Sequence, residues 1–153
     1  MIHTLQEKLV SVTAPISQAT NTSATTITID RAGWDFAMIT LYLGVGDTGV
    51  SVFKVQESDD SGMAGAADIV GTRYGTDPDY FGVTSVLPSA TDDGKFFVIP
   101  VNLLGKKRYI DVVCTLPAVG AASVLAIWCE LSRGEKGPET AAGFGVGNML
   151  AVA

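Results

Sequence analysis

Hydrophobic and polar residues alternate with a period of two along much of the chain. Thr26-Ile27-Thr28-Ile29-Asp30 is a short example, and such alternation is typical of a strand with one buried face. We find no segment with the apolar spacing of a long amphipathic helix. The pattern predicts strands over residues 26–30, 34–43, 50–57, 95–101, 108–116 and 122–131, with 69–70 and 83–87 as candidates for two shorter ones.

The last two of these segments indicate most clearly which side chains face inward. In each segment the apolar residues fall on one face of a strand, and we expect those faces in the core. The inward residues are Ile110, Val112, Cys114 and Leu116 in the first segment and Leu125, Ile127, Cys129 and Leu131 in the second. Tyr109, Asp111 and Thr115 then face solvent or a partner. We expect the two segments to pair around a turn at Pro117 and Gly120.

Seven or eight short strands separated by Gly, Asp and Pro turns predict a β-sandwich or barrel. We place this domain at residues 25–133. Residues 1–24 are predicted to form an N-terminal arm, because residues 17–26 are mostly Ser, Thr, Ala and Asn. Residues 134–153 are predicted to form a Gly- and Ala-rich C-terminal tail.

The composition is that of a folded protein with a high hydrophobicity. Of 153 residues, 47% are hydrophobic and only 17% are charged, whereas disordered chains combine low hydrophobicity with high net charge. The mean hydropathy is +0.33. We therefore expect part of the surface to be covered by neighbouring subunits.

The net charge of −6 argues against binding to nucleic acid or to an anionic membrane surface. Ten Lys and Arg residues face sixteen Asp and Glu residues, and phosphate binding needs a basic surface. The densest basic run, Lys106-Lys107-Arg108, is typical of a solvated turn. The first seven residues lack the basic and apolar regions of a secretory signal, so Cys114 and Cys129 are expected to be free, buried thiols.

The segment Gly44-Val45-Gly46-Asp47-Thr48-Gly49 matches the G-x-G-x-x-G pattern of dinucleotide-binding proteins. That pattern binds pyrophosphate at the N-terminus of a following helix. Here the next residues, Val50–Val55, are strongly β-forming. We therefore interpret the segment as a hairpin turn and predict no cofactor.

The remaining candidates for catalysis or metal binding have simpler explanations. The acidic pairs Asp59-Asp60 and Asp92-Asp93, together with Asp77 and Asp79, are flanked by Gly and Ser and are expected to stabilise turns. His3 is the only histidine, and two cysteines with one histidine cannot complete a standard zinc site. We predict that the protein is not an enzyme and binds no metal.

The aromatic residues divide into two groups. Trp34, Tyr42 and Trp128 lie in predicted strands, where aromatic side chains belong to the core more often than to a sugar-binding platform. Tyr74, Tyr80 and Phe81 lie in the least regular part of the sequence. Aromatic side chains in loops favour contacts with partners, because they combine a large apolar area with, in tyrosine, a polar tip.

Three segments of the chain resemble small structural proteins encoded in the head-gene region of tailed bacteriophages. They are Val52-Phe53-Lys54-Val55-Gln56-Glu57-Ser58-Asp59-Asp60, then Arg108-Tyr109-Ile110-Asp111-Val112, and then residues 124–133 with Pro138. In those proteins a strand and turn of the form hydrophobic-x-Val-Gln-Glu-Ser-Asp-Asp precedes an Arg-Tyr-hydrophobic strand and a last apolar strand. The resemblance extends over residues 35–138.

This resemblance implies a jelly-roll-like or related β-sandwich. Together with the strand pattern and the ends described above, it leads us to expect an all-β, jelly-roll-like β-sandwich of about eight antiparallel strands with extended N- and C-terminal arms. It also implies a capsid decoration (cement) protein, a homotrimer that binds the major capsid protein on the outer surface of the virion. Contacts are predicted in the arm, in the loop aromatics and in the tail. The predicted contact residues are Leu5, Leu9, Tyr74, Tyr80, Phe144 and Leu150.

Two alternatives remain open at this stage. One is another virion part, such as a head fibre base or a tail component. The other is a carbohydrate-binding β-sandwich module or a small hydrolase, which would be favoured by a groove that exposes Trp34 or Tyr80 beside paired carboxylates.

Overall fold

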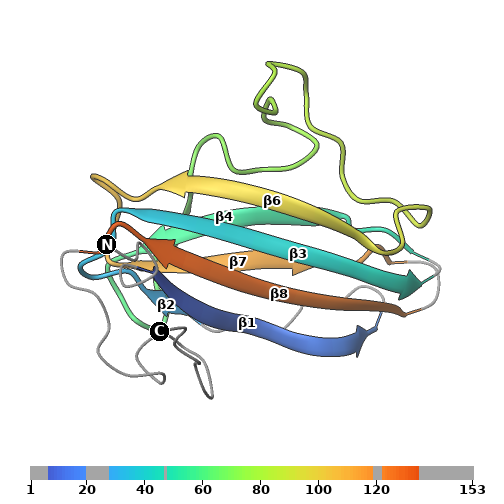
Figure 1. The fold of residues 1–153 in the computed structure, drawn as a ribbon, viewed down its shortest axis with the longest axis horizontal. Helices are drawn as coiled ribbons and strands as arrows, with labels where there is room; N and C mark the ends of the chain where they lie inside the picture. The colour runs from blue at the N-terminus through green and yellow to red at the C-terminus, as the bar shows by residue number, and fades with distance from the viewer. Residues whose placement is uncertain (1–6, 20–27, 47, 119–121, 135–153) are drawn as a thin grey trace, which may run out of the picture.

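The computed structural model describes residues 7–19, 28–46, 48–118 and 122–134. These residues form two four-stranded antiparallel sheets that pack face to face, as Figure 1 shows. The strands are β1 (Glu7–Gln18), β2 (Ile29–Asp30), β3 (Phe36–Gly46), β4 (Val52–Ser58), β5 (Ala67–Asp68), β6 (Lys95–Asn102), β7 (Tyr109–Thr115) and β8 (Ser123–Ser132). None of the described residues forms a helix that could cross a membrane.

The strand order identifies the topology as a jelly roll. Sheet A has the order β1-β8-β3-β6, and sheet B has the order β2-β7-β4-β5. The first strand pairs with the eighth, the second with the seventh, the third with the sixth and the fourth with the fifth, all antiparallel. This is the arrangement of one long antiparallel ribbon that is rolled so that successive strand pairs alternate between two sheets. The predicted jelly-roll-like β-sandwich is confirmed.

The core lies between the sheets and consists of the alternate side chains that the sequence pattern assigned to it. Every residue of the two predicted inward faces in β7 and β8 is at most 1% exposed. From β3, the side chains of Ala37, Ile39, Leu41 and Leu43 lie beside those of β8 in the same register. Cys114 and Cys129 are free and buried, as expected, and burial raises the pKa of each thiol to about 12.

The predicted N-terminal arm is wrong for residues 7–18, because they form β1 along the edge of sheet A. This strand pairs with β8 from Glu7 opposite Ser132 to Gln18 opposite Ser123. Its register shifts twice, between Ser11 and Thr13 and between Thr13 and Ile16. A bulge interrupts the alternation of side chains, so the period-two signal is lost although the backbone still pairs. Residues 1–6 and 20–24 of the arm, and residues 135–153 of the tail, lie outside the described residues.

The two predicted hairpins are also wrong, since the strands in question lie in different sheets. β3 belongs to sheet A and β4 to sheet B, and β7 and β8 are divided in the same way. Residues 44–49 therefore do not close a hairpin: β3 continues to Gly46, and the chain then crosses between the sheets. The glycines of this segment permit close packing. A Cβ on Gly46 would lie 2.6 Å from the Cα of Ser123, and one on Gly49 would lie 2.7 Å from the Cα of Ser89.

The segment between β5 and β6 contains less regular structure than predicted. Ala67–Asp68 form the short strand that was expected two residues later, and residues 83–87 form no strand beyond a single bridge between Pro78 and Thr84. Pro100 lies in β6, which is an edge strand of sheet A, where a residue without a backbone N–H is tolerated.

The close packing at Gly46 gives a test of the crossover. Gly46→Ala should lower the free energy of unfolding by about 3 kcal/mol, the upper part of the range for overpacking, because the new Cβ meets backbone that cannot rotate away. Gly62→Ala is the control, since its Cβ would meet nothing closer than a side-chain oxygen of Asp60 at 3.0 Å. Chemical denaturation of both variants measures the effect. Equal losses in the two variants would contradict the proposed packing.

Candidate interaction surfaces

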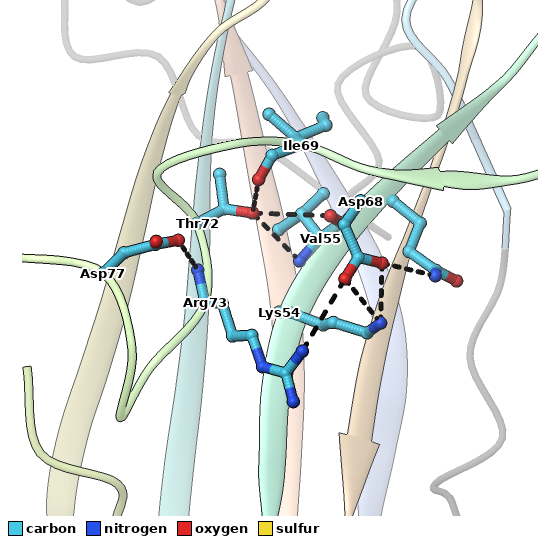
Figure 2. Close-up of polar contacts among 8 residues, drawn as sticks. Lys54, Val55, Asp68, Ile69, Thr72, Arg73 and Asp77 are labelled. Atoms are coloured by element: carbon cyan, nitrogen blue, oxygen red, sulfur yellow. Dashed lines mark hydrogen bonds and ion pairs between the residues drawn. The ribbon is translucent and has the colours of Figure 1, made fainter.

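The outer face of sheet B carries a polar network centred on the carboxylate of Asp68 (Figure 2). Lys54 Nζ donates to both carboxylate oxygens at 2.6 and 2.8 Å, Gln56 Nε2 donates at 2.7 Å, and Arg73 Nη1 lies 4.0 Å away. The hydrogen bond from Lys54 is the largest cause of a lowered pKa at Asp68. The carboxylate is thus surrounded by donors from its own chain and ties the segment after β5 to β4.

Residues 69–74, which follow β5, cover the edge of β4 in sheet B. Their backbone runs along β4, where Ile69 and Tyr74 donate from their backbone nitrogens to the carbonyls of Val55 and Phe53. Between them the hydroxyl of Thr72 accepts from the backbone nitrogen of Val55 and donates to the carbonyl of Ile69, as Figure 2 shows. This segment therefore protects a strand edge that would otherwise be open to pairing with another chain.

Tyr74 covers part of the edge of sheet A. Its hydroxyl donates to the carbonyl of Val98 at 3.0 Å and accepts from the backbone nitrogen of Val98 at 3.2 Å, on the edge of β6 that faces away from β3. The ring lies 5.3 Å from that of Phe53 and 6.1 Å from that of Phe97, and partial burial raises the pKa of the phenol. The contacts of Tyr74 are thus within its own chain.

Residues 69–94 form the connection between β5 and β6, which we call the projecting loop because it extends beyond β6 in Figure 1. Its acidic residues stabilise turns, as expected. Asp79 accepts from the backbone nitrogens of Phe81 and Val83, Asp77 accepts from that of Arg73, and Asp92 accepts from that of Ser89. These bonds hold the loop in a defined shape without burying its apolar side chains.

Five large apolar side chains of the projecting loop are exposed to solvent. They are Val70 (93% exposed), Tyr80 (97%), Phe81 (84%), Val83 (64%) and Val86 (78%). The rings of Tyr80 and Phe81 contact each other edge to face, with centroids 5.5 Å apart. Side chains of this size gain free energy from burial in proportion to their apolar area, so the loop favours binding to another apolar surface.

The outer face of sheet A is the second apolar surface, which we call the apolar face. The strand registers place ten half-buried to exposed apolar side chains on it: Leu9, Phe36, Met38, Tyr42, Phe96, Val98, Pro100, Val124, Ala126 and Trp128. The same rows also contain the polar residues Thr40, Asn102 and Ser132. Among the described residues, the charged side chains in these rows are Glu7 at the edge and Glu130 near the centre. A sheet face of this composition is typical of a buried interface.

An aromatic cluster lies on this face. The ring of Phe96, which is 61% exposed, lies 5.1 Å from that of Tyr42 and 6.0 Å from that of Trp128. The indole nitrogen of Trp128 donates to the carboxylate of Glu130 at 3.3 Å. Core positions were predicted for Trp34, Tyr42 and Trp128. The prediction is confirmed for Trp34, which is buried, and wrong for the other two, because each alternates with inward residues of its strand.

A hollow of about 430 Å³ lies between the projecting loop and the edge of β6. Tyr80, Phe81, Asp77 and Asp79 contribute to its walls, and Val98 to Pro100 form the side provided by the sheet. Within the described part of the chain, no three His, Cys, Asp or Glu side chains are grouped so that they could hold a metal ion.

The structure places the predicted contact residues unevenly. Tyr80 lies on the projecting loop and Leu9, which is 37% exposed, on the apolar face, whereas Tyr74 is used internally. Leu5, Phe144 and Leu150 lie outside the described residues. The sequence interpretation missed Phe96, Val98, Val70, Val83 and Val86 as contact candidates. For Phe96 and Val98 a signal was present, because they alternate with the inward Phe97 and Ile99.

Comparison with known proteins gives no family assignment. No family model matches the chain, and no curated protein matches it. One solved structure, from work described as "Bacillus endospore appendages form a novel family of disulfide-linked pili", aligns over 83% of this chain and 89% of that chain. The two chains are 16% identical and the TM-score is 0.33, which is too low for this likeness to inform the fold or the function.

The carboxylates of Asp30 and Asp68 make stability depend on pH. Hydrogen bonds from Arg108 and Lys54, respectively, lower the pKa of each below the ordinary value of 3.8. Their contribution is therefore complete above about pH 4 and is lost as the pH falls and the folded-state carboxylates take up protons. Denaturation at about pH 7 and about pH 3 should show that Asp68→Asn reduces the difference between the two conditions. Unchanged pH dependence in this variant would contradict the role assigned to Asp68.

Proposed function

We propose that this protein is a virion structural protein that decorates a capsid as a homotrimer and stabilises the assembled head by binding its outer surface. The observation that carries the proposal is the amount of apolar surface that the folded chain leaves exposed. The apolar face covers one outer side of the sandwich, and the projecting loop adds five large exposed side chains beyond its edge. A protein that worked alone in water would gain nothing from this surface.

The fold and the sequence resemblance support the same proposal from different directions. Jelly-roll sandwiches occur in viral capsid proteins, although the same fold also serves lectins and enzymes. The segments that resemble phage head proteins fall on β4 with its following turn, on β7 and on β8, and so belong to the body of the sandwich rather than to its connections. In this function the residues act by burying area against neighbours.

The stabilising effect would follow from mass action. A protein that binds assembled capsid subunits but not separate ones lowers the free energy of the assembled state by an amount that grows with the concentration of free protein. The acidic balance of the chain, with a net charge of −6, is compatible with a position outside the particle, away from DNA.

Deletion of the gene from the producing virus tests this proposal. Particles without the protein should lose infectivity at a lower temperature and under milder osmotic shock than normal particles, and added purified protein should restore the difference. The protein should also sediment with intact heads. Deleted particles that match normal ones in both treatments would contradict the stabilising role, and density elsewhere on the particle would favour a head fibre base or a tail component.

A second candidate function is saccharide binding in the hollow beside β6. There the exposed rings of Tyr80 and Phe81 lie near the carboxylates of Asp77 and Asp79. Aromatic rings can pack against the apolar face of a sugar while carboxylates accept hydrogen bonds from its hydroxyl groups. Of the two residues whose exposure would favour such a groove, Tyr80 meets the condition, and Trp34 does not because it is buried.

A glycan array measures this second function directly. Saccharide binding should appear as signal for a defined class of glycans, and Tyr80→Ala should weaken it at least tenfold. Leu104→Ala changes an exposed apolar residue outside the hollow and should leave the signal unchanged. An array without signal for the wild-type protein would exclude saccharides of the classes displayed.

A further inference from the structure

The two apolar surfaces of this chain differ in shape. The apolar face is the broad outer side of a four-stranded sheet, whereas the projecting loop extends beyond the edge strand of that sheet (Figure 1). This loop carries the exposed side chains of Tyr80, Phe81 and Val83. A flat surface and a projection complement each other better than either complements itself. Two different surfaces of one chain that fit together produce a heterologous contact, which closes into a ring when the rotation permits.

The low density of charge on the apolar face leaves it open to a second copy of the chain. Each copy carries a net charge of −6, so association through most of its surface brings like charges together. Lys54, Asp68 and Arg73 form their network on the outer side of sheet B, away from the apolar face. On the apolar face, the carboxylate of Glu130 already accepts a hydrogen bond from Trp128. Among the described residues, a second copy meets only Glu7 and Glu130 as charged side chains in the rows of this face, and the loop carboxylates of Asp77 and Asp79 that it brings are held by backbone nitrogens of its own loop.

The available area is of the right order for a specific contact. Four strands of about eight residues cover roughly 20 by 27 Å, or about 500 Å² in projection. A standard protein interface buries about 800 Å² on each partner. In a ring, every copy contributes its face to one neighbour and its loop to the other, so the area buried per copy exceeds that of the face alone.

We propose that the projecting loop of one copy packs across the apolar face of the next, with Tyr80 and Phe81 against the cluster of Tyr42, Phe96 and Trp128, and that three such contacts close the ring. The number of three rests on the proposed function, in which the protein is a trimer. The arrangement buries the rings of Tyr80 and Phe81 and the aromatic cluster between copies, whereas exposed apolar side chains such as Val70 and Val86 stay available for the capsid contact of the proposed function. It leaves the polar outer side of sheet B free in the assembly.

Two single substitutions separate the two halves of this contact. Phe96→Glu places a charge on the apolar face, and Phe81→Glu places one on the loop; both side chains are exposed, so the fold should tolerate the change. Light scattering should give about 48 kDa for the wild-type protein, three times the 15.9 kDa of the chain, and a threefold lower mass for each variant. Leu104→Glu, at an exposed apolar residue outside both surfaces, should leave the mass unchanged.

A mixture of the two variants is the decisive measurement. The Phe96→Glu protein keeps an intact loop and the Phe81→Glu protein keeps an intact face, so one contact can form between them but no ring can close. The mixture should therefore contain a complex of about 32 kDa, twice the mass of the chain. Because each variant must be folded to form it, this species also excludes misfolding as the cause of the lower masses.

Three results would overturn the inference. A monomeric wild-type protein would leave the two surfaces to other partners. An unchanged mass for Phe81→Glu, with dissociation by Phe96→Glu, would indicate that two apolar faces contact each other directly. A mixture that remains monomeric would show that the loop does not bind the face. All of these measurements use isolated protein without particles, so they fail or succeed independently of the capsid-binding test.

Discussion

The packing of two sheets against each other through alternate side chains is the constraint on which this structure depends. In each long strand every second side chain points into the core, and the jelly-roll pairing of the eight strands brings these apolar sides together. The remaining side chains of each strand point away from the core and are not needed for the packing of the two sheets. They can be polar or apolar without altering the architecture, so their character carries information about what the outer sides contact.

The outer sides of the two sheets differ in composition. On sheet B, Asp68 gathers Lys54, Gln56 and Arg73 into a network that suits water. On sheet A, the corresponding positions hold Tyr42, Phe96 and Trp128. The hydroxyl groups of Thr72 and Tyr74 form hydrogen bonds with backbone groups at the edges of β4 and β6, which hinders pairing of these edges with strands of other chains. The edges of β4 and β6 are thus covered while one apolar side is left exposed, and at these edges this combination favours association by side-chain packing rather than by backbone pairing.

The alternation in the sequence predicted the strand class, most strand positions and the inward faces of β7 and β8, because period-two patterning is a local property. It missed β1, where two bulges interrupt the period, and it assigned hairpins to segments that cross between sheets, because sheet membership depends on long-range pairing. The resemblance to head proteins, and not the pattern, suggested the jelly roll. Of the candidate contacts, Tyr80 was identified from its loop context, whereas Phe96 was hidden in a strand.

The case of Tyr42 and Trp128 explains why an apolar outer side is difficult to recognise from sequence. A strand with one buried side alternates, but a strand with apolar residues on both sides gives a continuous hydrophobic run, as residues 36–43 do. Such a run is equally typical of a strand enclosed within one chain and of a strand enclosed between two. The sandwich removes the ambiguity, since sheet A has sheet B on one side only. The second apolar side of β3 is therefore best explained by a covering layer from another molecule, and the exposed rings of the projecting loop of a second copy are suited to supply this layer.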